Sequence, residues 1–553
     1  MRNEQDRLLF LLQHGMKWSK AYQGDMFCHK FIVTGVKKKM KKGILKATAG
    51  VLSLAMILGL CGCKKESTGG VAVLPTSETK ITKEPTELTL FYIGSEGKKL
   101  EELEIWKEIA KRTNVSLKTI SSINASDEST AFNTMMASGD LPDLIIYSDA
   151  KKVMPKYGKE GAFASLNDLI DTYAPNIKKL IDSNKEVKAH LTASDGQIYF
   201  ISSVNPKLPA SGWFVRKDWI DKLGLEVPKT VDEFHDMLVA FRDGDPNGNG
   251  IKDEVPYFNR FDGIGHLLLL FDTITNWEIV DDDIVYGPTT PQFKEAYKNI
   301  AQWYKEGLID KEIYTRGSKS RDKLLGDNVG GATHDYFGTT AQYNDMLKDT
   351  VPGINFVPIA PPNNKEYTQR DLVAMRGIAI SAKSKKKEVA MRFLDYMFSE
   401  DGTLITNFGI EGEHYDMKDE YPTYKDWVLH GDKTTVDILS EAGAASAFPH
   451  KFDFRYEEQW LTPLAKEGMD MYQKYLTPQV PVLTYDAQDE ERFNKIMTDV
   501  RTYVDEYTQK WVFGSASVDD TYDEYLAQIK KLGIDEATEI QRKAYKNYRE
   551  MVK

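Results

Sequence analysis

The stretch Leu88-Thr-Leu-Phe-Tyr-Ile93 begins the pattern that decides the fold, because it is a strand-like run bounded by a glycine. Apolar residues then recur at helical spacing over 100–110, a second strand-like run covers 115–120, and a helical segment covers 131–137. The continuous apolar run Leu144-Ile-Ile-Tyr147 predicts a third strand. Strands alternating with helices in this order predict a parallel sheet with right-handed crossovers, and therefore an α/β fold.

Ligands of parallel sheets bind beyond the carboxyl ends of the strands. The loops Gly94-Ser-Glu96 and Tyr147-Ser-Asp149 follow two of the predicted strands, so the pattern places them at a possible ligand cleft. Further along, Thr230-Val-Asp-Glu233 is a capping box that predicts a helix ending at Asp243-Gly244. The C-terminal third has mostly helical spacing, as in residues 519–532 and 536–548.

Length and composition bound the class of protein. The chain has 553 residues, which fits two or three domains, and 41% of them are hydrophobic. Its formal charge is -11, whereas a general nucleic-acid-binding protein needs a basic surface, so we expect no nucleic-acid partner. All three cysteines, Cys28, Cys61 and Cys63, precede the body of the chain, which therefore has no disulfide framework and no cysteine nucleophile.

The N-terminal part has the pattern of a secretory leader. A lysine-rich block at 37–42 precedes an apolar run at 47–60, which is shorter than the roughly 20 residues that span a bilayer. The run ends at Leu60-Cys-Gly-Cys63, which resembles the bacterial lipobox and predicts that Cys63 carries a lipid anchor at the outer face of the cell membrane. The alternative is an uncleaved membrane anchor.

The same pattern divides the N-terminal region into three parts. Met40-Lys-Lys-Gly43 is an ordinary start for a signal peptide, so residues 1–39 are predicted to be an over-extended N-terminus and 40–62 the signal peptide. Residues 63–87, rich in Ser, Thr, Gly, Pro and Lys, predict a flexible tether.

The strongest chemical motif is Asp245-Pro-Asn-Gly-Asn-Gly-Ile-Lys-Asp-Glu254. Its acidic and amide side chains alternate with glycines that allow a tight loop, so several oxygens can converge. Oxygen ligands without His or Cys indicate calcium, and we expect a structural ion. The predicted ligands are Asp245, Asn247, Asn249, the Ile251 carbonyl, Asp253 and Glu254.

Two registers and a metal-free alternative remain at this loop. A twelve-residue EF-hand count starts at Asp243 and ends at Glu254, whereas a shorter loop starts at Asp245 and uses the whole series of Asp and Asn side chains. We prefer the shorter loop. The alternative without a metal is a turn stabilised by Asx and glycine residues alone.

The run from Arg216-Lys-Asp-Trp219 through Pro228 and Thr230 leads directly into this loop, and together they resemble a known family. It is the family of extracellular solute-binding lipoproteins of bacterial carbohydrate ABC importers (family 1). The resemblance is strongest to the long subgroup that includes the lipoprotein LplA and the alginate-binding proteins, and it covers roughly residues 85–550.

The resemblance implies a two-lobed periplasmic-binding-protein-like (type II) fold with the ligand between the lobes and hinge crossovers near Phe200–Asn205, Gly377 and Gly409. Lobe 1 would comprise 88–204 and 376–408. Lobe 2 would comprise 205–375 and 409–553, with the calcium loop at 245–254. It implies a monomer that captures a carbohydrate and passes it to ABC permease subunits, without enzymatic activity.

Candidate ligand residues are aromatic side chains that could stack on sugar rings and polar side chains near the crossovers. They are Tyr147, Trp213, Arg216, Trp277, Tyr336, Arg376, Glu411 and Tyr415. For each residue taken alone, a place in the core or at the surface is the better expectation.

No catalytic motif emerges, because the histidines are scattered and neither a nucleophile elbow nor a phosphate loop occurs. Two alternatives to a carbohydrate receptor remain open. One is a surface-anchored polysaccharide-degrading enzyme, because scattered carboxylates could form a glycosidase pair. The other is a receptor for a non-sugar nutrient on the same fold, since a fold does not fix its ligand.

Overall fold

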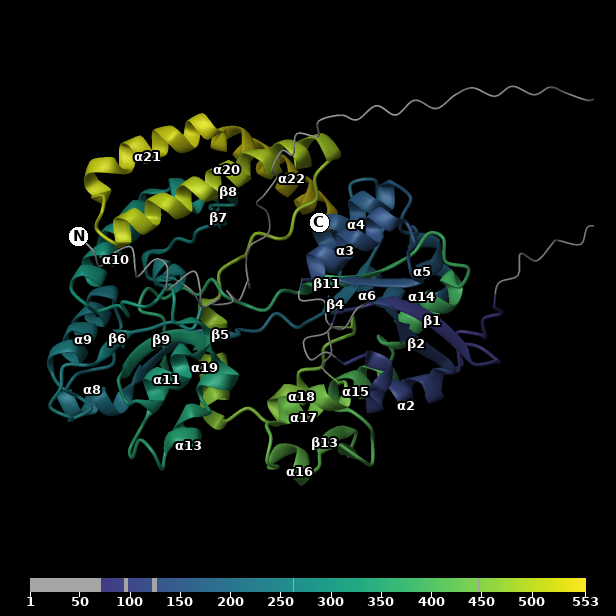
Figure 1. The fold of residues 1–553 in the computed structure, drawn as a ribbon, viewed down its shortest axis with the longest axis horizontal. Helices are drawn as coiled ribbons and strands as arrows, with labels where there is room; N and C mark the ends of the chain where they lie inside the picture. The colour runs from purple at the N-terminus through teal and green to yellow at the C-terminus, as the bar shows by residue number, and fades with distance from the viewer. Residues whose placement is uncertain (1–70, 94–97, 122–126, 262, 445–447) are drawn as a thin grey trace, which may run out of the picture. The chain divides into compact units, whose positions relative to one another are not determined.

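The computed structural model describes residues 71–93, 98–121, 127–261, 263–444 and 448–553. All of them belong to the unit Ser67–Lys553. They form two main β-sheets, each with its own hydrophobic core, and we call these the first and the second lobe (Figure 1). The predicted leader, the predicted lipid site at Cys63 and the loop Gly94-Ser-Glu96 lie outside the described residues.

The sheet of the first lobe has the strand order β2-β1-β3-β11-β4. Its strands are β1 (Thr86–Phe91), β2 (Val115–Thr119), β3 (Leu144–Tyr147), β4 (Ile201–Val204) and β11 (Val373–Ile380). Strand β1 pairs in parallel with β2 and β3, which confirms the predicted parallel α/β arrangement. Strand β11 returns from far along the chain and pairs antiparallel with both β3 and β4.

Amphipathic helices supply the rest of the first core. They are α2 (Glu104–Thr113), preceded by the 3₁₀ turn η1 (Leu100–Glu102), α3 (Glu128–Ser138), α4 (Ala150–Lys159), α5 (Asn167–Tyr173), α6 (Pro175–Ser183), α7 (Lys185–Leu191), α14 (Lys387–Tyr396) and α15 (Glu400–Phe408). Their buried apolar residues belong to the same cluster as the sheet.

The second lobe has the sheet order β10-β5-β9-β6. The strands are β5 (Ser211–Arg216), β6 (Val255–Tyr257), β9 (Gly330–Tyr336) and β10 (Phe356–Ile359), and a separate hairpin consists of β7 (Trp277–Val280) and β8 (Asp283–Tyr286). Its helices include α8 (Lys217–Leu223), α9 (Val231–Asp243), η2 (Gly265–Phe271), η3 (Gly287–Thr289), α10 (Pro291–Lys305), η4 (Gly317–Lys319), α11 (Ser320–Gly326), α12 (Phe337–Thr340), α13 (Tyr343–Leu347), α19 (Pro463–Tyr472) and η5 (Gln473–Tyr475). Helix α9 begins as predicted, because the Thr230 hydroxyl accepts a hydrogen bond from the Glu233 amide at 3.2 Å.

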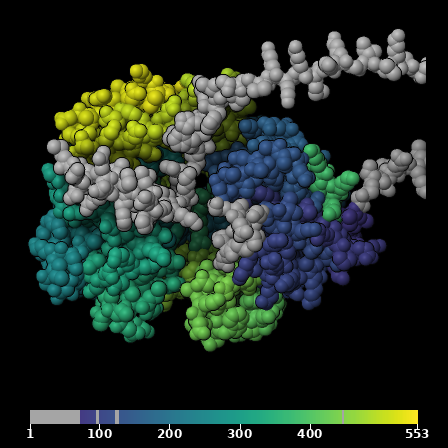
Figure 2. All heavy atoms as spheres, in the orientation of Figure 1, coloured from purple at the N-terminus to yellow at the C-terminus, as the bar shows by residue number. Residues whose placement is uncertain are grey.

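The C-terminal region consists of three long helices, α20 (Ala487–Val512), α21 (Val518–Leu532) and α22 (Ile534–Val552), which confirms its predicted helical character. Their buried residues join the second core, and in Figures 1 and 2 these yellow helices cover one side of the teal second lobe. Among the described residues, no helix combines the length and the apolar character that crossing a bilayer would require.

Three connecting segments link the two lobes, and the segments are hydrogen-bonded to one another or to the end of β4. The first follows β4, and the second leads into β11: the Asn205 amide donates to the Leu372 carbonyl at 2.9 Å, and the Arg370 amide donates to the Leu208 carbonyl at 3.1 Å. The third segment runs next to the end of β4, where the Phe452 amide donates to the Val204 carbonyl at 2.9 Å. The first crossover is therefore close to its predicted place at Phe200–Asn205.

The other two crossovers differ from the prediction. Gly377 lies inside β11, and a side chain there would come within 2.6 Å of the Ser202 hydroxyl, so its small size serves close strand packing. Gly409 ends α15 with φ +90. After it, β12 (Tyr415–Lys418), β13 (Tyr421–Tyr424), α16 (Asp426–Leu429) and α17 (Thr435–Ala442) add residues to the first core. The chain leaves the first lobe only near Phe448, before α18 (Arg455–Glu458).

The start of the first lobe also differs from the prediction. Val73 forms a bridge with Thr82, Ile81 is fully buried, and Arg392 donates to the carbonyl of Glu78 at 2.8 Å. Residues 71–87, predicted to be flexible tether, therefore pack against the first core. Their composition is polar, and the apolar residues Val73 and Ile81 are isolated from one another, which is why no periodic pattern reveals the segment.

Candidate functional site

The loop at 245–254 follows α9 and is closed by short hydrogen bonds from its own backbone. Asp245 accepts bonds from the amides of Gly248 and Gly250 at 3.0 and 3.1 Å, and Asn249 accepts one from the Ile251 amide at 2.7 Å. Both glycines have φ above +70, a conformation that favours glycine. The side chains of Asp245, Asn247 and Asn249 therefore fold back onto the loop itself, where their oxygens accept hydrogen bonds from its backbone amides.

Glu254 is the feature of this loop that a turn alone does not explain. Both of its carboxylate oxygens are buried and, within the part of the chain that the structure describes, have no hydrogen-bond partner. Burial, together with the negative charges of Asp253 and Asp245, raises the pKa of its carboxyl group. An ionised carboxylate in this position needs a cation, so the residues present fit a calcium ion with Glu254 as one ligand.

The two registers differ in whether Asp243 belongs to the loop. The Asp243 carboxylate accepts a hydrogen bond from Arg242 Nε at 3.0 Å, so it is already paired at the end of α9. The Asp245 carboxylate instead lies within the loop, where it accepts from the backbone amides of Gly248 and Gly250. Asp253 in turn accepts hydrogen bonds from the side-chain amides of Asn247 and Asn249 at 3.1 Å. Lys222 of α8 donates to the Pro246 carbonyl at 2.7 Å and so attaches the loop to the second lobe.

A second candidate site lies at the carboxyl ends of β6 and β9, two parallel neighbours in the second sheet. Here the guanidinium of Arg260 lies 4.7 Å from the ring centre of Phe261 and 5.1 Å from that of Tyr336. Phe261 is 38% exposed and Tyr336 is 44% exposed. We call these three residues the arginine–aromatic group.

Asp335 holds this group in place from below. Its fully buried carboxylate accepts a hydrogen bond from Arg260 Nε at 2.8 Å and another from Arg321 at 3.0 Å. Charge-assisted bonds of this kind fix the plane of the Arg260 guanidinium against the two rings. The result is a rigid surface that combines ring faces with hydrogen-bond donors, which is the chemistry that a sugar requires.

The register of the sheet places this group next to the crossovers. Tyr336, the last residue of β9, pairs with Ser211, the first residue of β5 after the first crossover. The Ser211 hydroxyl lies 2.7 Å from the hydroxyl of Thr368 in the second crossover. The arginine–aromatic group therefore lies at the edge of the second sheet from which the chain passes to the first lobe.

The corresponding edge of the first sheet carries two of the predicted residues. Tyr147 ends β3 and stacks on Phe132 with ring centres 4.2 Å apart. Its partner in β11 is Gly377, next to Arg376, which forms an ion pair with Glu128 at 2.8 Å. Tyr147 is itself buried, with 8% of its surface exposed, and this burial raises the pKa of its hydroxyl. Tyr147 and Arg376 are thus near one another, whereas Tyr336 belongs to the other sheet.

Two predicted stacking residues are instead part of the second core. Trp213 is fully buried, with its ring centre 5.1 Å from those of Phe234 and His334. Trp277 is also buried and packs against Tyr286 in the β7–β8 hairpin. A ring without an exposed face cannot stack on a sugar, so packing explains both residues, which is the alternative that their sequence context allows.

The remaining predicted residues are also not gathered at the crossovers. Arg216 is buried, donates to Asp218 at 2.6 Å and lies 4.4 Å from the Trp219 ring centre, so it is a structural cation at the start of α8. Tyr415 is buried in the first core. Glu411 is exposed and forms a bridge with Tyr415 in the loop before β12.

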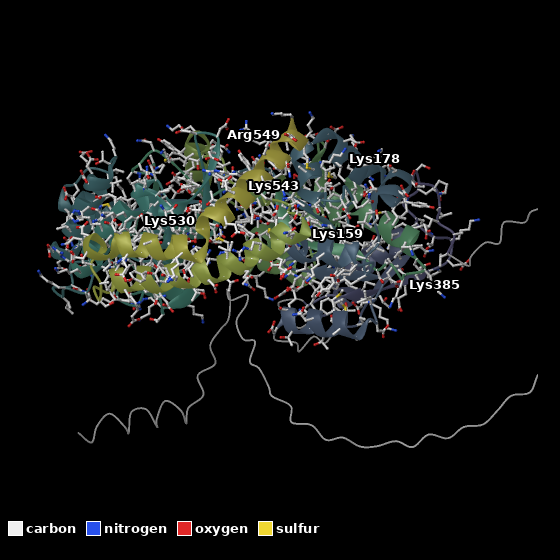
Figure 3. The ribbon with its side chains drawn as sticks, turned by 90° about the horizontal axis from the view of Figure 1, so that it is seen from above. Lys159, Lys178, Lys385, Lys530, Lys543 and Arg549 are labelled. Carbon is white, nitrogen blue, oxygen red and sulfur yellow. The ribbon has the colours of Figure 1, made fainter. Side chains whose placement is uncertain are left out.

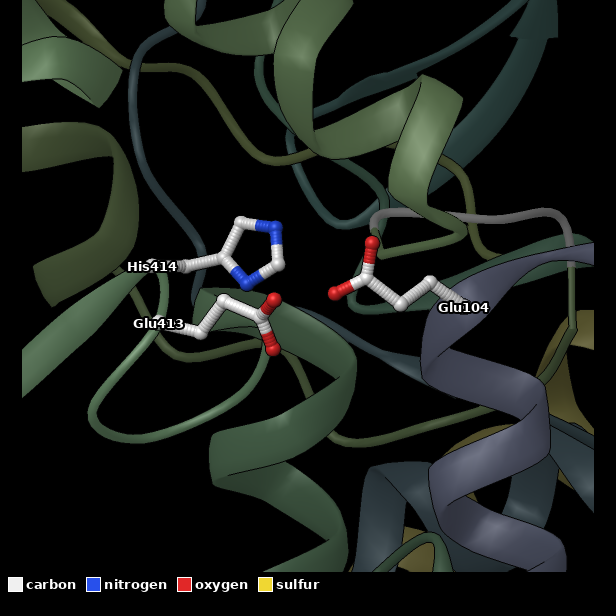
Figure 4. Close-up of side chains that lie close together, drawn as sticks. All are labelled: Glu104, Glu413 and His414. Carbon is white, nitrogen blue, oxygen red and sulfur yellow. The ribbon is translucent and has the colours of Figure 1, made fainter.

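Glu104, Glu413 and His414 converge in the first lobe, with one potential ligand atom from each within 4.8 Å of the others (Figure 4). Burial and the facing Glu413 raise the pKa of the Glu104 carboxyl group, so a proton can occupy the space between the two carboxylates. His414 Nδ1 already accepts a hydrogen bond from the Ile410 amide at 3.2 Å. We therefore assign no metal to this cluster.

Sequence reasoning missed Arg260, Phe261 and Asp335. No motif marks them, because they lie at or just after the ends of two strands, β6 and β9, that are far apart in the sequence and adjacent only in the sheet. One signal was present: Asn259-Arg-Phe261 follows a short apolar run, and residues that follow a strand are those that reach the ligand edge of an α/β sheet.

Comparison with known proteins shows which family this chain resembles. A family model described as bacterial extracellular solute-binding protein matches residues 97–404. The chain is 27% identical over 565 residues to the fructooligosaccharide ABC transporter substrate-binding protein FusA of Streptococcus pneumoniae, covering 92% of this chain and 98% of the relative. It is 26% identical over 444 residues to the polygalacturonan/rhamnogalacturonan-binding protein YtcQ of Bacillus subtilis, covering 77% of this chain and 84% of the relative.

The solved structures agree in fold. The crystal structure of the alginate-binding protein AlgQ2 without calcium ion superposes with a TM-score of 0.74 and 37% identity, covering 85% of this chain and 99% of that one. FusA in complex with kestose superposes with a TM-score of 0.69 and 23% identity, covering 84% and 99%. The mixed α/β architecture is thus that of the two-lobed, periplasmic-binding-protein-like solute-binding proteins.

Proposed function

The chain belongs to the bacterial extracellular solute-binding protein family, and from this premise we propose that it captures an oligosaccharide outside the cell and delivers it to an ABC importer. The observation that carries the sugar assignment is the arginine–aromatic group at the edge of the second sheet. Exposed rings next to a fixed guanidinium are suited to the apolar faces and hydroxyl groups of sugar rings. Relatives named for fructooligosaccharide and polygalacturonan binding support this class of ligand.

The binding residues come from both lobes in this proposal. Tyr336, Arg260 and Phe261 bind one side of the sugar, and the Tyr147 hydroxyl and Arg376 at the edge of the first sheet bind the other. The lobes close on the ligand by bending at the three connecting segments. No bond of the sugar is made or broken, because the proposed task of the residues is to hold the ligand and release it intact to the permease subunits.

We further propose that the loop at 245–254 binds a structural calcium ion through Asp245, Asn247, Asn249, the Ile251 carbonyl, Asp253 and Glu254. The buried carboxylate of Glu254 without a hydrogen-bond partner supports this assignment. The similar AlgQ2 structure, named as being without calcium ion, is consistent with a calcium site in relatives. The loop lies at the end of α9, so the ion would stabilise the second lobe without contacting the sugar.

The location proposed for the protein is the outer face of the cell membrane. The leader ending at Leu60-Cys-Gly-Cys63 supports a lipid anchor at Cys63, and residues 64–70 would connect it to the first lobe. A monomer that binds one ligand between its two lobes is sufficient for this task.

A panel of oligosaccharides tests the proposed function. The panel contains kestose, a maltotriose, a galactotriose, a trigalacturonate and a trimannuronate, each at millimolar concentration, and the readout is the thermal midpoint of the chain. A ligand that binds only the native state raises the midpoint. Titration calorimetry of each hit should give one equivalent bound, and chromatography should recover the sugar intact. Turnover of the sugar at catalytic concentrations of protein would instead indicate an enzyme.

A further inference from the structure

Lys151, the second residue of α4, is a buried cation without an anionic partner. Only 6% of its surface is exposed. Its ammonium donates hydrogen bonds to the His190 carbonyl and to the Thr484 hydroxyl, the latter at 3.1 Å. Among the ion pairs of the described residues, none includes Lys151. Burying an ammonium group without a carboxylate is costly, so this position calls for an explanation.

The contact of Lys151 joins the two lobes. His190 lies at the end of α7 in the first lobe, whereas Thr484 lies in the extended segment before α20. Leu483 and Tyr485, on either side of Thr484, pack into the second core. Thr484 alone turns the other way, accepting from Lys151 and donating to the Thr192 carbonyl at 3.4 Å.

Further contacts extend this junction along α22. This helix packs against α7 of the first lobe, and it also packs against β8 and α20 of the second lobe. In Figure 3 the labelled Lys543 and Arg549 mark α22, and Lys159 marks α4. Residues 483–552 thus contact both lobes, and we call them the C-terminal latch.

The charged groups around Lys151 do not neutralise it. Burial, and secondarily the charge of Lys151, lowers the pKa of His190 to about 3, so this imidazole is neutral. Burial raises the pKa of the Glu490 carboxyl group in α20, and the nearby charges of Lys159 and Lys156 act to lower it. Both lysines belong to α4, the helix that also contains Lys151. Arg376 of β11, against which α4 packs, is paired with Glu128. Burial accordingly lowers the pKa of Lys151 to about 7.

We propose that the C-terminal latch closes on α4 and α7 reversibly, and that the desolvated ammonium of Lys151 keeps this contact weak enough to open. Closing removes the ammonium from water and gives it only neutral acceptors, whereas opening hydrates it again. The lobes are therefore held together by the packing of α22 on α7 and released by the cost of one buried charge. Such a balance suits a protein whose lobes must separate for each ligand.

The proposal has a definite pH dependence. In the open form Lys151 has an ordinary pKa near 10.4, so it binds more protons than the closed form between pH 7 and pH 10. Closing must therefore strengthen as the pH rises above 7 and be insensitive to pH below it. From pH 6.5 to pH 8.5 the closing equilibrium should increase by up to about twentyfold.

Amide hydrogen exchange of residues 186–192 and 483–490, corrected for the intrinsic effect of pH, tests the latch without any ligand. The chain as it exists should exchange more slowly at pH 8.5 than at pH 6.5 in both segments. Lys151→Met, which keeps the length but not the charge, should exchange slowly at both pH values. Thr484→Val, which removes an acceptor of Lys151, should exchange faster than the unmodified chain.

Lys152→Met is the matched control, because Lys152 is the exposed neighbour and forms an ion pair with Asp149 at 3.5 Å. It should leave both segments and their pH dependence unchanged. Exchange in Lys151→Met that equals that of the unmodified chain at both pH values would overturn the proposal. So would Thr484→Val without an effect, which keeps the test decisive if Lys151→Met does not fold. This test is independent of the proposed sugar ligand.

Discussion

The Arg260 guanidinium lies 5.1 Å from the ring centre of Tyr336, although the two residues are 76 positions apart in the sequence. Arg260 follows β6 and Tyr336 ends β9, and these two strands run in parallel. The same guanidinium is fixed by Asp335, the residue that precedes Tyr336. Because Asp335 points into the core and Tyr336 points outward, the alternation of β9 supplies both the support and the contact surface. The end of β9 thus builds the proposed sugar surface together with Arg260 and Phe261, which follow β6.

Replacing Tyr336 tests this surface directly. Tyr336→Ala should weaken the binding of the identified oligosaccharide by about 1–3 kcal/mol, because it removes a stacking ring from a partly hydrated surface. The thermal midpoint should change little, since the side chain is 44% exposed. Calorimetric titration and a melting curve of the same sample measure both quantities.

Trp213→Ala is the matched contrast, because Trp213 lies in the neighbouring strand but is fully buried. We expect this variant to lose about 3–5 kcal/mol of unfolding free energy, as large-to-small core substitutions do, and to bind sugar normally where it folds. The opposite pattern, weak binding with an unchanged midpoint for Trp213→Ala, would return this residue to the ligand site.

The contrast between these two rings shows what the sequence could predict. Strand and helix periodicity correctly indicated the first sheet, because β1, β2 and β3 are local, continuous runs with helices between them. Whether an aromatic residue in such a run faces the core or the ligand depends on pairing with distant strands. Trp213 and Tyr336 are both aromatic residues of strands in the same sheet, and only the register separates them.

The lobe boundaries were predictable only in part for a similar reason. The first crossover was predicted directly after a strand, near Phe200–Asn205, whereas the segment from β12 to α17 was assigned to lobe 2. Its apolar residues, such as Tyr424 and Leu439, belong to the first core. Nothing in their spacing indicates which of two cores they join, because both cores bury the same kinds of side chain.

Calcium removal should lower the thermal midpoint of the chain, and Glu254→Gln should abolish this response. The physical reason is that the ion binds only the folded loop and compensates the buried carboxylate of Glu254. Elemental analysis of protein purified without chelator measures the metal content directly. Asp243→Asn is the control. In the shorter register Asp243 pairs with Arg242 and is not a calcium ligand, so the calcium response of this variant should persist.

The metal-free protein should also show a particular pH dependence. The folded-state pKa of Glu254 is raised, so the folded state binds more protons than the unfolded state above the ordinary pKa of glutamate. Its contribution to stability is therefore present at low pH and lost as the pH rises through the raised pKa. Chemical denaturation between pH 4 and pH 7 with chelator should show this loss. Glu254→Gln should remove it, and a pH-independent difference between the two proteins would contradict the assignment.

Cys63→Ser should release the protein from the membrane lipid fraction, because Cys63 is the predicted site of the thioether-linked lipid. Incorporation of radiolabelled fatty acid measures the modification. Cys61→Ser is the matched control, since Cys61 precedes the predicted cleavage site and should not be lipidated. Label that persists in Cys63→Ser would rule out this anchor.

Ligand binding should bring the lobes together by bending the connecting segments rather than the strands. The segments at 205–210 and 367–373 are held to each other by only a few backbone bonds, such as that from Arg370 to Leu208, so dihedral changes there disturb neither core. Small-angle scattering should therefore give a smaller radius of gyration with a saturating oligosaccharide than without it.

Gly377→Ala separates bending from packing in this prediction. A methyl group at Gly377 would come within 2.6 Å of the Ser202 hydroxyl and 2.8 Å of the Phe200 ring, so the variant should unfold at a lower temperature. Because Gly377 lies inside β11 and not in a connecting segment, the folded variant should still contract on binding. A variant that stays folded but no longer contracts would make Gly377 a hinge residue. An unmodified chain that binds its ligand without any change in radius would contradict capture by lobe closure.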